Sequence, residues 1–333
     1  MDAQQFLTSL IQDKSEYVMN KEDETLLRTE GLVRFVFRKL SLAKYKASAT
    51  SKNYEQKILD KIELCVNHRK PIHVTLPFGA AKSPYQPTAP EVDWAEVMNI
   101  AYIKDYLKPI AKVYKHGIIL EYISVGVFEE KMNRIPQRDV DLYDRQFTRL
   151  IAYYQKYLPK NFVLKYTRVA DLYDANELSR LIDIKVGQLA KSWSKNDQKT
   201  RDYKLVKAKR NCLWKSQEKD LDEIWLQSIF VHDAFCSECW TLEASPWDHK
   251  DMITLGHNYT AGWAIHVRST PGSSVNFWSG TGVLLKRGEV YVPSVLSFSQ
   301  YGKVKEQMKE EKVAILPKEL GQNLTQVPIL VEK

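Results

Sequence analysis

Short apolar segments alternate with longer amphipathic segments between residues 71 and 192, and this alternation constrains the fold more than any other feature of the sequence. Alternating strands and helices favour a parallel sheet with helices packed on its faces. The sequence therefore predicts an α/β fold with a Rossmann-like, mostly parallel sheet and flanking helices. The expected strands are 71–77, 118–123 and 162–166. The first expected helix covers 94–113 in two parts that are broken near Pro109, and the second covers 140–157. A third helix is expected to begin at an Asp174 cap and to run towards Ser192.

The segments on either side of this core have different periodicities. Apolar residues at helical spacing, such as Phe6 with Leu10 and Ile58 with Ile62, predict a helical N-terminal region over residues 1–68. A strand at 263–268 and a hairpin joining 282–285 to 290–292 predict a β-rich C-terminal part. We expect an α/β core over residues 69–315 and a C-terminal tail over residues 316–333.

Composition narrows the cellular location and the class of partner. Four cysteines are too few for a disulfide framework in 333 residues, and no apolar run reaches the roughly 20 residues that cross a bilayer. The first residues lack the basic and apolar regions of a secretory signal. We therefore expect a cytoplasmic protein with reduced thiols and no membrane partner. The net charge of +8 favours anionic partners: phosphorylated small molecules, nucleic acid or an acidic surface.

The loop after the first expected strand, residues 78–90, is the first candidate site. It is longer than the roughly 2–6 residues that usually connect elements of α/β units. Lys82 offers a cation and Ser83 a hydroxyl to an anionic ligand, and the small residues before them let backbone N–H groups approach it. Such sheets bind ligands beyond the carboxyl ends of their strands, which favours a functional loop. The alternative is a solvated loop with an ordinary surface lysine.

Polar residues also follow the second and third expected strands. Ser124 and Gly126 can bring the backbone close to a ligand, or they can simply form the turn. Arg168 can clamp a phosphate or carboxylate, and Asp171 can orient it or bind an amine. The alternative for the second pair is a local ion pair worth roughly 0–1 kcal/mol.

His266 and Arg268 form a further candidate pair. Strand alternation places both side chains on one face of the expected strand 263–268. A histidine can transfer protons near neutral pH, and an arginine beside it can hold a substrate anion. The alternative is a hydrogen-bonded core histidine.

Two more segments are open to a functional interpretation. Cys236 and Cys239 lie near His232, His249 and His257, so four zinc ligands could come from this region. The histidine spacing is irregular and no second C-x-x-C exists, so we predict no metal here and buried, reduced cysteines.

In the basic stretch 195–215, which includes Lys207 and Arg210, there are eight lysines and arginines and only two aspartates. It predicts a solvated helix face, with nucleic-acid binding as the alternative.

Taken in order, these segments resemble the isocyanide (isonitrile) synthase family, the pyoverdine/dityrosine biosynthesis proteins. The resemblance spans roughly residues 72–296. Its parts are Lys82-Ser83-Pro84, Asp93-Trp94-Ala95-Glu96, Tyr114 with Gly117, Ser124 followed by Gly126-Val127-Phe128, Ile135-Pro136, Asp139, Tyr143, the Arg168 and Asp171 strand end, and Ile265-His266.

The resemblance implies that the amino group of an aromatic amino acid, usually tyrosine or tryptophan, becomes an isonitrile. Ribulose 5-phosphate would supply the carbon, and no metal or redox cofactor would be required. Strand-end position and residue type assign the roles: we expect His266 and Lys82 to be catalytic, with His266 transferring protons. Lys82, Arg168 and Arg268 are the candidate cations for the sugar phosphate, and Asp171 is the candidate anchor for the ammonium group.

The chain departs from the family pattern at two places. The family typically has Ser-Asp-Gly where this chain has Ser124-Val125-Gly126, and it typically has an arginine where this chain has Gly262-Trp263. We therefore interpret the chain as a diverged relative. The alternatives are a basic nucleic-acid-binding protein and a non-catalytic relative that binds a metabolite or a protein.

Overall fold

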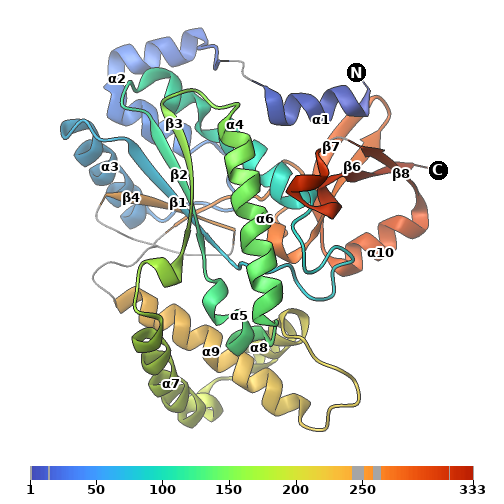
Figure 1. Cartoon of the computed structure of the whole chain (residues 1–333). Helices are drawn as coiled ribbons and strands as arrows, with labels where there is room; N and C mark the ends of the chain where they lie inside the picture. The colour runs from blue at the N-terminus through green and yellow to red at the C-terminus, as the bar shows by residue number, and fades with distance from the viewer. Residues whose placement is uncertain (1, 14–15, 242–250, 258–263, 315, 333) are drawn as a thin grey trace.

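The computed structural model describes residues 2–13, 16–241, 251–257, 264–314 and 316–332, drawn as a ribbon in Figure 1. Within them, one sheet has five parallel strands in the order β3-β2-β1-β4-β5. This parallel sheet confirms the predicted α/β fold. Its strands are β1 (Ile72–Phe78), β2 (Ile118–Ser124), β3 (Phe162–Arg168), β4 (Met252–Gly256) and β5 (Ile265–His266).

Helices pack on both faces of this sheet (Figure 1). Helix α3 (Lys52–Asn67) packs on β1 and β4, while α4 (Trp94–Val113) packs on β2 and α6 (Gln137–Gln155) packs on β3. Helix α4 continues through Pro109, so the expected break there is wrong. Proline removes one backbone hydrogen bond, but α4 is buried along nearly its whole length. Packing on all sides therefore holds the helix together where local propensity opposes it.

The N-terminal region is helical, as predicted. Helix α1 (Ala3–Gln12) packs on α4, and α2 (Lys21–Leu40) packs on α3 and α4. Gly31 interrupts α2 with φ +79, a conformation that glycine adopts readily. Apolar side chains of α1 and α3, among them Leu7 and Ile62, belong to the same core cluster as the central strands.

A second, four-stranded sheet in the order β7-β6-β9-β8 forms the β-rich C-terminal part. Its strands are β6 (Thr281–Arg287), β7 (Val290–Leu296), β8 (Met308–Ala314) and β9 (Gln326–Glu332), and α10 (Phe298–Gln307) lies between β7 and β8 in the chain. The predicted hairpin is present, because β6 and β7 pair antiparallel around Gly288 at φ +57. Residues 316–333, the expected tail, contain β9, which pairs with both β6 and β8.

Four helices gather at the carboxyl ends of the parallel strands, at the bottom of Figure 1. We call α5 (Glu129–Asn133), α7 (Ala175–Ser192), α8 (Gln198–Asn211) and α9 (Leu221–Thr241) the helical lobe. Helix α9 is its centre, because α5, α7 and α8 all pack against it. Short 3-10 turns complete the chain at Gly126–Phe128, Val169–Asp171, Trp193–Lys195, Phe277–Ser279, Lys318–Leu320 and Gln322–Leu324.

None of the helices described in this structure combines the length and apolar character needed to cross a membrane.

Candidate active site

A cavity of about 380 Å³ lies between the carboxyl edge of the parallel sheet and the helical lobe. The register aligns the ends of three strands there, with Phe78 beside Ser124 and Ser124 beside Arg168. The cavity volume falls within the roughly 300–1,000 Å³ of small-molecule sites. It opens where ligands of parallel α/β sheets usually bind. Residues from β1, β4, α5, α8 and α9 line it, together with the 3-10 turn that holds Trp278.

Aromatic rings form one wall of the cavity. Phe78, at the end of β1, lies 5.1 Å from Phe277 and 6.0 Å from Trp278 between ring centroids. Gly79 follows Phe78, and a Cβ atom there would lie 2.8 Å from Trp278 Nε1 and 3.2 Å from Glu129 Oε1. Only glycine lets the strand end, the Trp278 ring and Glu129 approach so closely.

The opposite wall carries a chain of polar side chains from α8 and α9. Lys207 Nζ lies 3.2 Å from His232 Nε2, and His232 Nδ1 lies 3.3 Å from Asp233 Oδ1. Asp233 also accepts a hydrogen bond of 2.5 Å from Lys204 Nζ. An ammonium group can only donate to the imidazole, so with Lys207 protonated Nε2 accepts and Nδ1–H donates to Asp233.

Burial shifts the pKa values of this wall. It lowers the pKa of Lys207 and of His232, because charged forms lose hydration inside the protein. For the pKa of Lys207, Cys236 and Asp233 oppose this fall, and the Arg210 and Lys204 cations add to it. Cys236 stands one helical turn after His232 on α9 and also lines the cavity, but burial raises the pKa of its thiol to about 11. Cys236 is therefore an uncharged thiol at neutral pH.

Glu129 is the one carboxyl group among the described residues that line the cavity. It is 5% exposed and accepts a hydrogen bond of 2.7 Å from Asn133 Nδ2. Burial raises the pKa of Glu129 to about 7, against the smaller effect of the Asn133 bond. A carboxyl group with this pKa can both donate and accept a proton near neutral pH.

His257 lines the cavity from the end of β4 but has no free ring nitrogen. Its Nδ1 lies 3.0 Å from the Val267 carbonyl and its Nε2 lies 3.0 Å from Asn99 Nδ2. Burial lowers the pKa of His257 to about 4. The neutral ring is thus a structural link between β4, α4 and the segment after β5.

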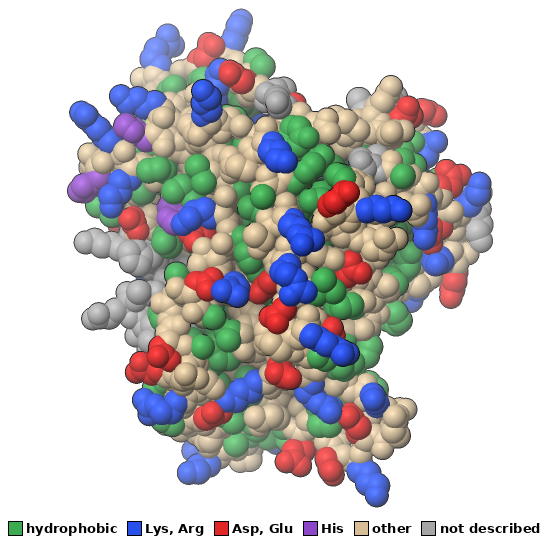
Figure 2. Space-filling view, viewed as in Figure 1, with side chains coloured by type: hydrophobic (Ala, Val, Ile, Leu, Met, Phe, Trp, Pro, Cys, Tyr) green, Lys and Arg blue, Asp and Glu red, His purple; other side chains and the backbone are tan. Residues whose placement is uncertain are grey.

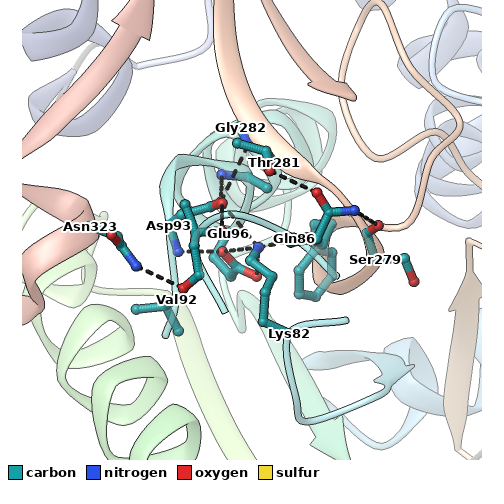
Figure 3. A network of polar contacts seen from close by, with 12 residues as sticks. Lys82, Gln86, Val92, Asp93, Glu96, Ser279, Thr281, Gly282 and Asn323 are labelled. Carbon is teal, nitrogen blue, oxygen red and sulfur yellow. Dashed lines mark hydrogen bonds and ion pairs between the residues drawn. The ribbon is translucent and has the colours of Figure 1, made fainter. Parts of the chain in front are cut away.

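Lys82 lies in a buried ionic network rather than at a mobile loop surface (Figure 3). Its Nζ lies 3.1 Å from Asp93 Oδ1 and 2.8 Å from Glu96 Oε1, and it also donates to the Phe277 carbonyl at 3.0 Å. Asp93 and Glu96 form the capping box that begins α4. Burial raises the pKa of Glu96, and the Lys82 ammonium opposes that rise. The network ties loop 78–90 to α4 and to the turn that holds Trp278.

Ser83, Ser124 and Gly126 lie around the cavity. Ser83 lines a smaller hollow of about 40 Å³ that shares Glu129 and Trp278 with the main cavity. The Ser124 hydroxyl lies 3.4 Å from Asp144 Oδ1 and accepts a hydrogen bond of 3.3 Å from the Gly126 N–H. These two residues therefore shape the turn around Val125, which lines the cavity itself.

Arg168 and Asp171 pair with each other. Arg168 Nη2 lies 2.7 Å from Asp171 Oδ1, with side chains 54% and 46% exposed. The Arg168 guanidinium lowers the pKa of Asp171. At this exposure the geometry matches the ion-pair alternative of the sequence analysis.

His266 and Arg268 both contact the segment between α2 and α3. His266 Nδ1 lies 2.8 Å from Ser48 Oγ and its Nε2 lies 3.3 Å from the His257 carbonyl. Arg268 Nε donates to the Lys46 carbonyl at 3.3 Å. Burial lowers the pKa of His266. The Gly262-Trp263 departure lies outside the described residues.

Within the described part of the chain, none of the eight residues predicted from the sequence lines the main cavity, although Gly79 and Val125, which belong to the same loop and turn as Lys82 and Ser124, do. Their catalytic and substrate-binding roles stay predictions. Sequence reasoning missed Glu129 and Trp278, and it assigned Lys207 and Arg210 to a solvated helix face. The spacing of His232 and Cys236, four residues apart, was the signal that both share one face of a helix.

The metal prediction concerns α9. The described residues contain no group of three or more histidine, cysteine or acidic side chains that could hold a metal ion. His249 and the side chain of Cys239 lie outside the described residues, so the absence of a metal at this motif stays a prediction.

Comparison with known proteins yields a structural match only. No family model matches the sequence, and no curated protein matches it either. The crystal structure of the PvcA protein from Pseudomonas aeruginosa has a similar fold, with a TM-score of 0.63 at 15% sequence identity. The match covers 90% of this chain and 99% of that chain. The chain therefore shares the fold of PvcA over almost the full length of both proteins.

Proposed function

We propose that the chain is an isonitrile synthase-like enzyme that condenses the amine of an amino acid, with aromatic side chains favoured, with ribulose 5-phosphate. The observation that carries this proposal is the combination of cations, aromatic rings and a buried carboxyl group with a pKa of about 7 in one cavity at the carboxyl edge of the sheet. The shared fold with PvcA and the sequence resemblance support it.

Each part of the cavity matches one part of the proposed reaction. Arg210 would bind the phosphate, because a guanidinium forms paired hydrogen bonds with phosphate oxygens. Phe235 and Trp278 would pack against the aromatic side chain of the amino acid. Glu129 would move the protons that amine addition to a ketone requires. Neither a metal nor a redox cofactor enters this scheme.

The sequence-based site residues enter the proposal as supports of the cavity. Lys82 would fix the loop that carries Gly79 through its ion pairs with Asp93 and Glu96. Ser124 would fix the turn that carries Val125. His266 and Arg268 would hold the segment beside β5.

The test is product analysis by mass spectrometry. Purified protein is incubated with tyrosine or tryptophan and ¹³C-labelled ribulose 5-phosphate, and we expect an isonitrile that carries the label in its isonitrile carbon. The Glu129→Gln variant should lose roughly 10²–10⁴-fold in turnover if it transfers protons. Thermal stabilisation by ribulose 5-phosphate without any labelled isonitrile would reject the synthase and favour the metabolite-binding relative.

The nucleic-acid alternative gains no support from the face seen in Figure 2. Lysine and arginine side chains are interspersed there with aspartate and glutamate. Sequence-independent nucleic-acid binding instead needs a continuous basic surface.

A further inference from the structure

Lys207 occupies a position that the proposed function does not yet use. It reaches the cavity from α8 and also lines a second hollow of about 130 Å³ between α8 and α9. Its ammonium group has no carboxylate partner within ion-pair distance among the described residues, whereas the neighbouring Lys204 is paired with Asp233. The Lys207 Nζ instead donates a hydrogen bond to an imidazole nitrogen, His232 Nε2.

An imidazole partner stabilises the ammonium form of Lys207 less than a carboxylate would, because neutral His232 carries no negative charge. Its Nε2 can also accept a proton from Lys207. Burial lowers the pKa of Lys207, which favours the neutral amine. The His232 side chain is 35% exposed and lines the cavity, and Asp233 accepts a hydrogen bond from its Nδ1–H. The three side chains therefore form a line that can remove a proton from the lysine and return it.

We propose that Lys207 is a nucleophilic amine that forms an imine with the ketone of a sugar phosphate bound in the cavity, assisted by His232 and Asp233. The inference rests on the proposed function for the identity of the ketone. It adds a covalent step, in which the enzyme first carries the sugar phosphate and then passes it to the amino acid.

The step balances without an oxidant or a reductant. The Lys207 nitrogen adds to the ketone carbon, a C–N bond forms, and the carbonyl electron pair moves to oxygen. The surplus proton on nitrogen passes through His232 Nε2 to that oxygen, while Asp233 stabilises the transient imidazolium. The remaining N–H proton then passes through His232 Nε2 to the hydroxyl group, which leaves as water while a C=N bond forms. The amino acid amine adds to this carbon, and Lys207 leaves with a proton, so that the sum is amine plus ketone giving imine plus water.

Nucleophilic lysines of this kind act in apolar pockets or beside other cations, which keep them neutral. The surroundings of Lys207 supply both conditions, since Phe235 and Trp278 line the same cavity and Arg210 stands one helical turn further along α8. Cys236, the other potential nucleophile of this wall, is held as a thiol by its raised pKa.

Reductive trapping tests the proposal. The full chain is incubated with ribulose 5-phosphate and sodium cyanoborohydride near neutral pH, and adducts are located by intact mass and peptide mapping. We expect one adduct per chain, on Lys207. Lys207→Arg keeps a positive charge but cannot form an imine, so its adduct should vanish. Lys199→Arg, an exposed lysine of the same helix, is the matched control and should be labelled like the wild type.

The His232→Gln variant separates a role of His232 in proton transfer from a role in holding the fold or the ligand. It should slow adduct formation at least tenfold while ribulose 5-phosphate still raises the melting temperature, because binding does not require the proton transfer. Labelling of Lys207 no faster than of Lys199, or wild-type isonitrile formation by Lys207→Arg, would overturn the inference. An adduct on Lys207 without isonitrile product would leave the inference standing and reject the proposed function.

Discussion

Glu129 couples the cavity to the stability of the fold. Its pKa is about 7 in the folded chain and about 4.5 when exposed, because burial disfavours the carboxylate. Between these two pH values the unfolded chain has released the proton and the folded chain still holds it. The folded state then binds more protons, so its stability falls as pH rises from about 4.5 to 7.

We therefore predict that Glu129→Gln flattens this part of the pH profile. Glutamine has the same shape and no charge, so the variant should lose less stability than the wild type over that interval, by roughly 2–3 kcal/mol. Urea denaturation at pH 4.5, 6 and 7.5 measures the difference. Parallel profiles for the two proteins would mean that Glu129 titrates normally.

Gly79 gives a second prediction at the scale of one residue. Gly79→Ala places a methyl group against the Trp278 ring and Glu129, so one of them must move, at a cost of about 1–3 kcal/mol. The thermal shift caused by ribulose 5-phosphate should shrink as the cavity distorts. Gly187→Ala is the control, because a Cβ atom at this position in α7 meets nothing within 4 Å. Alanine should stabilise that helix by roughly 0.5–1 kcal/mol.

The sequence predicted the positions of strand ends but not the contacts that their side chains make. The strand ends at Ser124 and Arg168 were predicted, and the register places them side by side. Which way their side chains turn depends on partners far along the chain. Ser124 turns to Asp144 on α6, and Lys82 turns to carboxylates that begin α4. No local pattern contains these partners.

At the scale of elements, the start of α4 depends on the Lys82 network. Lys82→Met leaves Asp93 and Glu96 as neighbouring buried carboxylates without their cation, which should cost roughly 3–5 kcal/mol. Urea denaturation measures the loss. Adding Glu96→Gln to Lys82→Met should recover part of it, since one of the two charges disappears. If Lys82→Met unfolds like the wild type, the network does not hold α4 in place.

Helix α9 explains why the sequence did not predict the helical lobe in full. Apolar residues occur on all sides of it, among them Trp225, Phe230 and Val231, because α5, α7 and α8 surround it. Because its buried residues are not confined to one side, α9 has no single apolar face, so the periodicity that revealed the amphipathic helices is weak here. Without a clear helical periodicity for α9, the sequence could not show that Lys207 of α8 meets His232 of α9.

At the scale of the whole molecule, β9 joins the end of the chain to the core. Val327 and Ile329 belong to the main core cluster, and β9 pairs with both β6 and β8. We predict that deleting residues 326–333 prevents stable folding, because β6 and β8 lose their shared neighbour and the core loses apolar surface. Circular dichroism and thermal melting measure the effect. Deleting residue 333 alone is the control, and it should leave the circular dichroism spectrum and the melting temperature unchanged.

The position of β9 has a consequence for how the protein is made. The strand that lies between β6 and β8 follows both of them in the chain, and β4, which pairs with β1, is also separated from its partner by well over a hundred residues. Neither sheet can close while the nascent chain is still short, so strand edges stay open during synthesis. Translation that stalls before β9 has been made would thus release an aggregation-prone chain, although every residue of the proposed site had already been made.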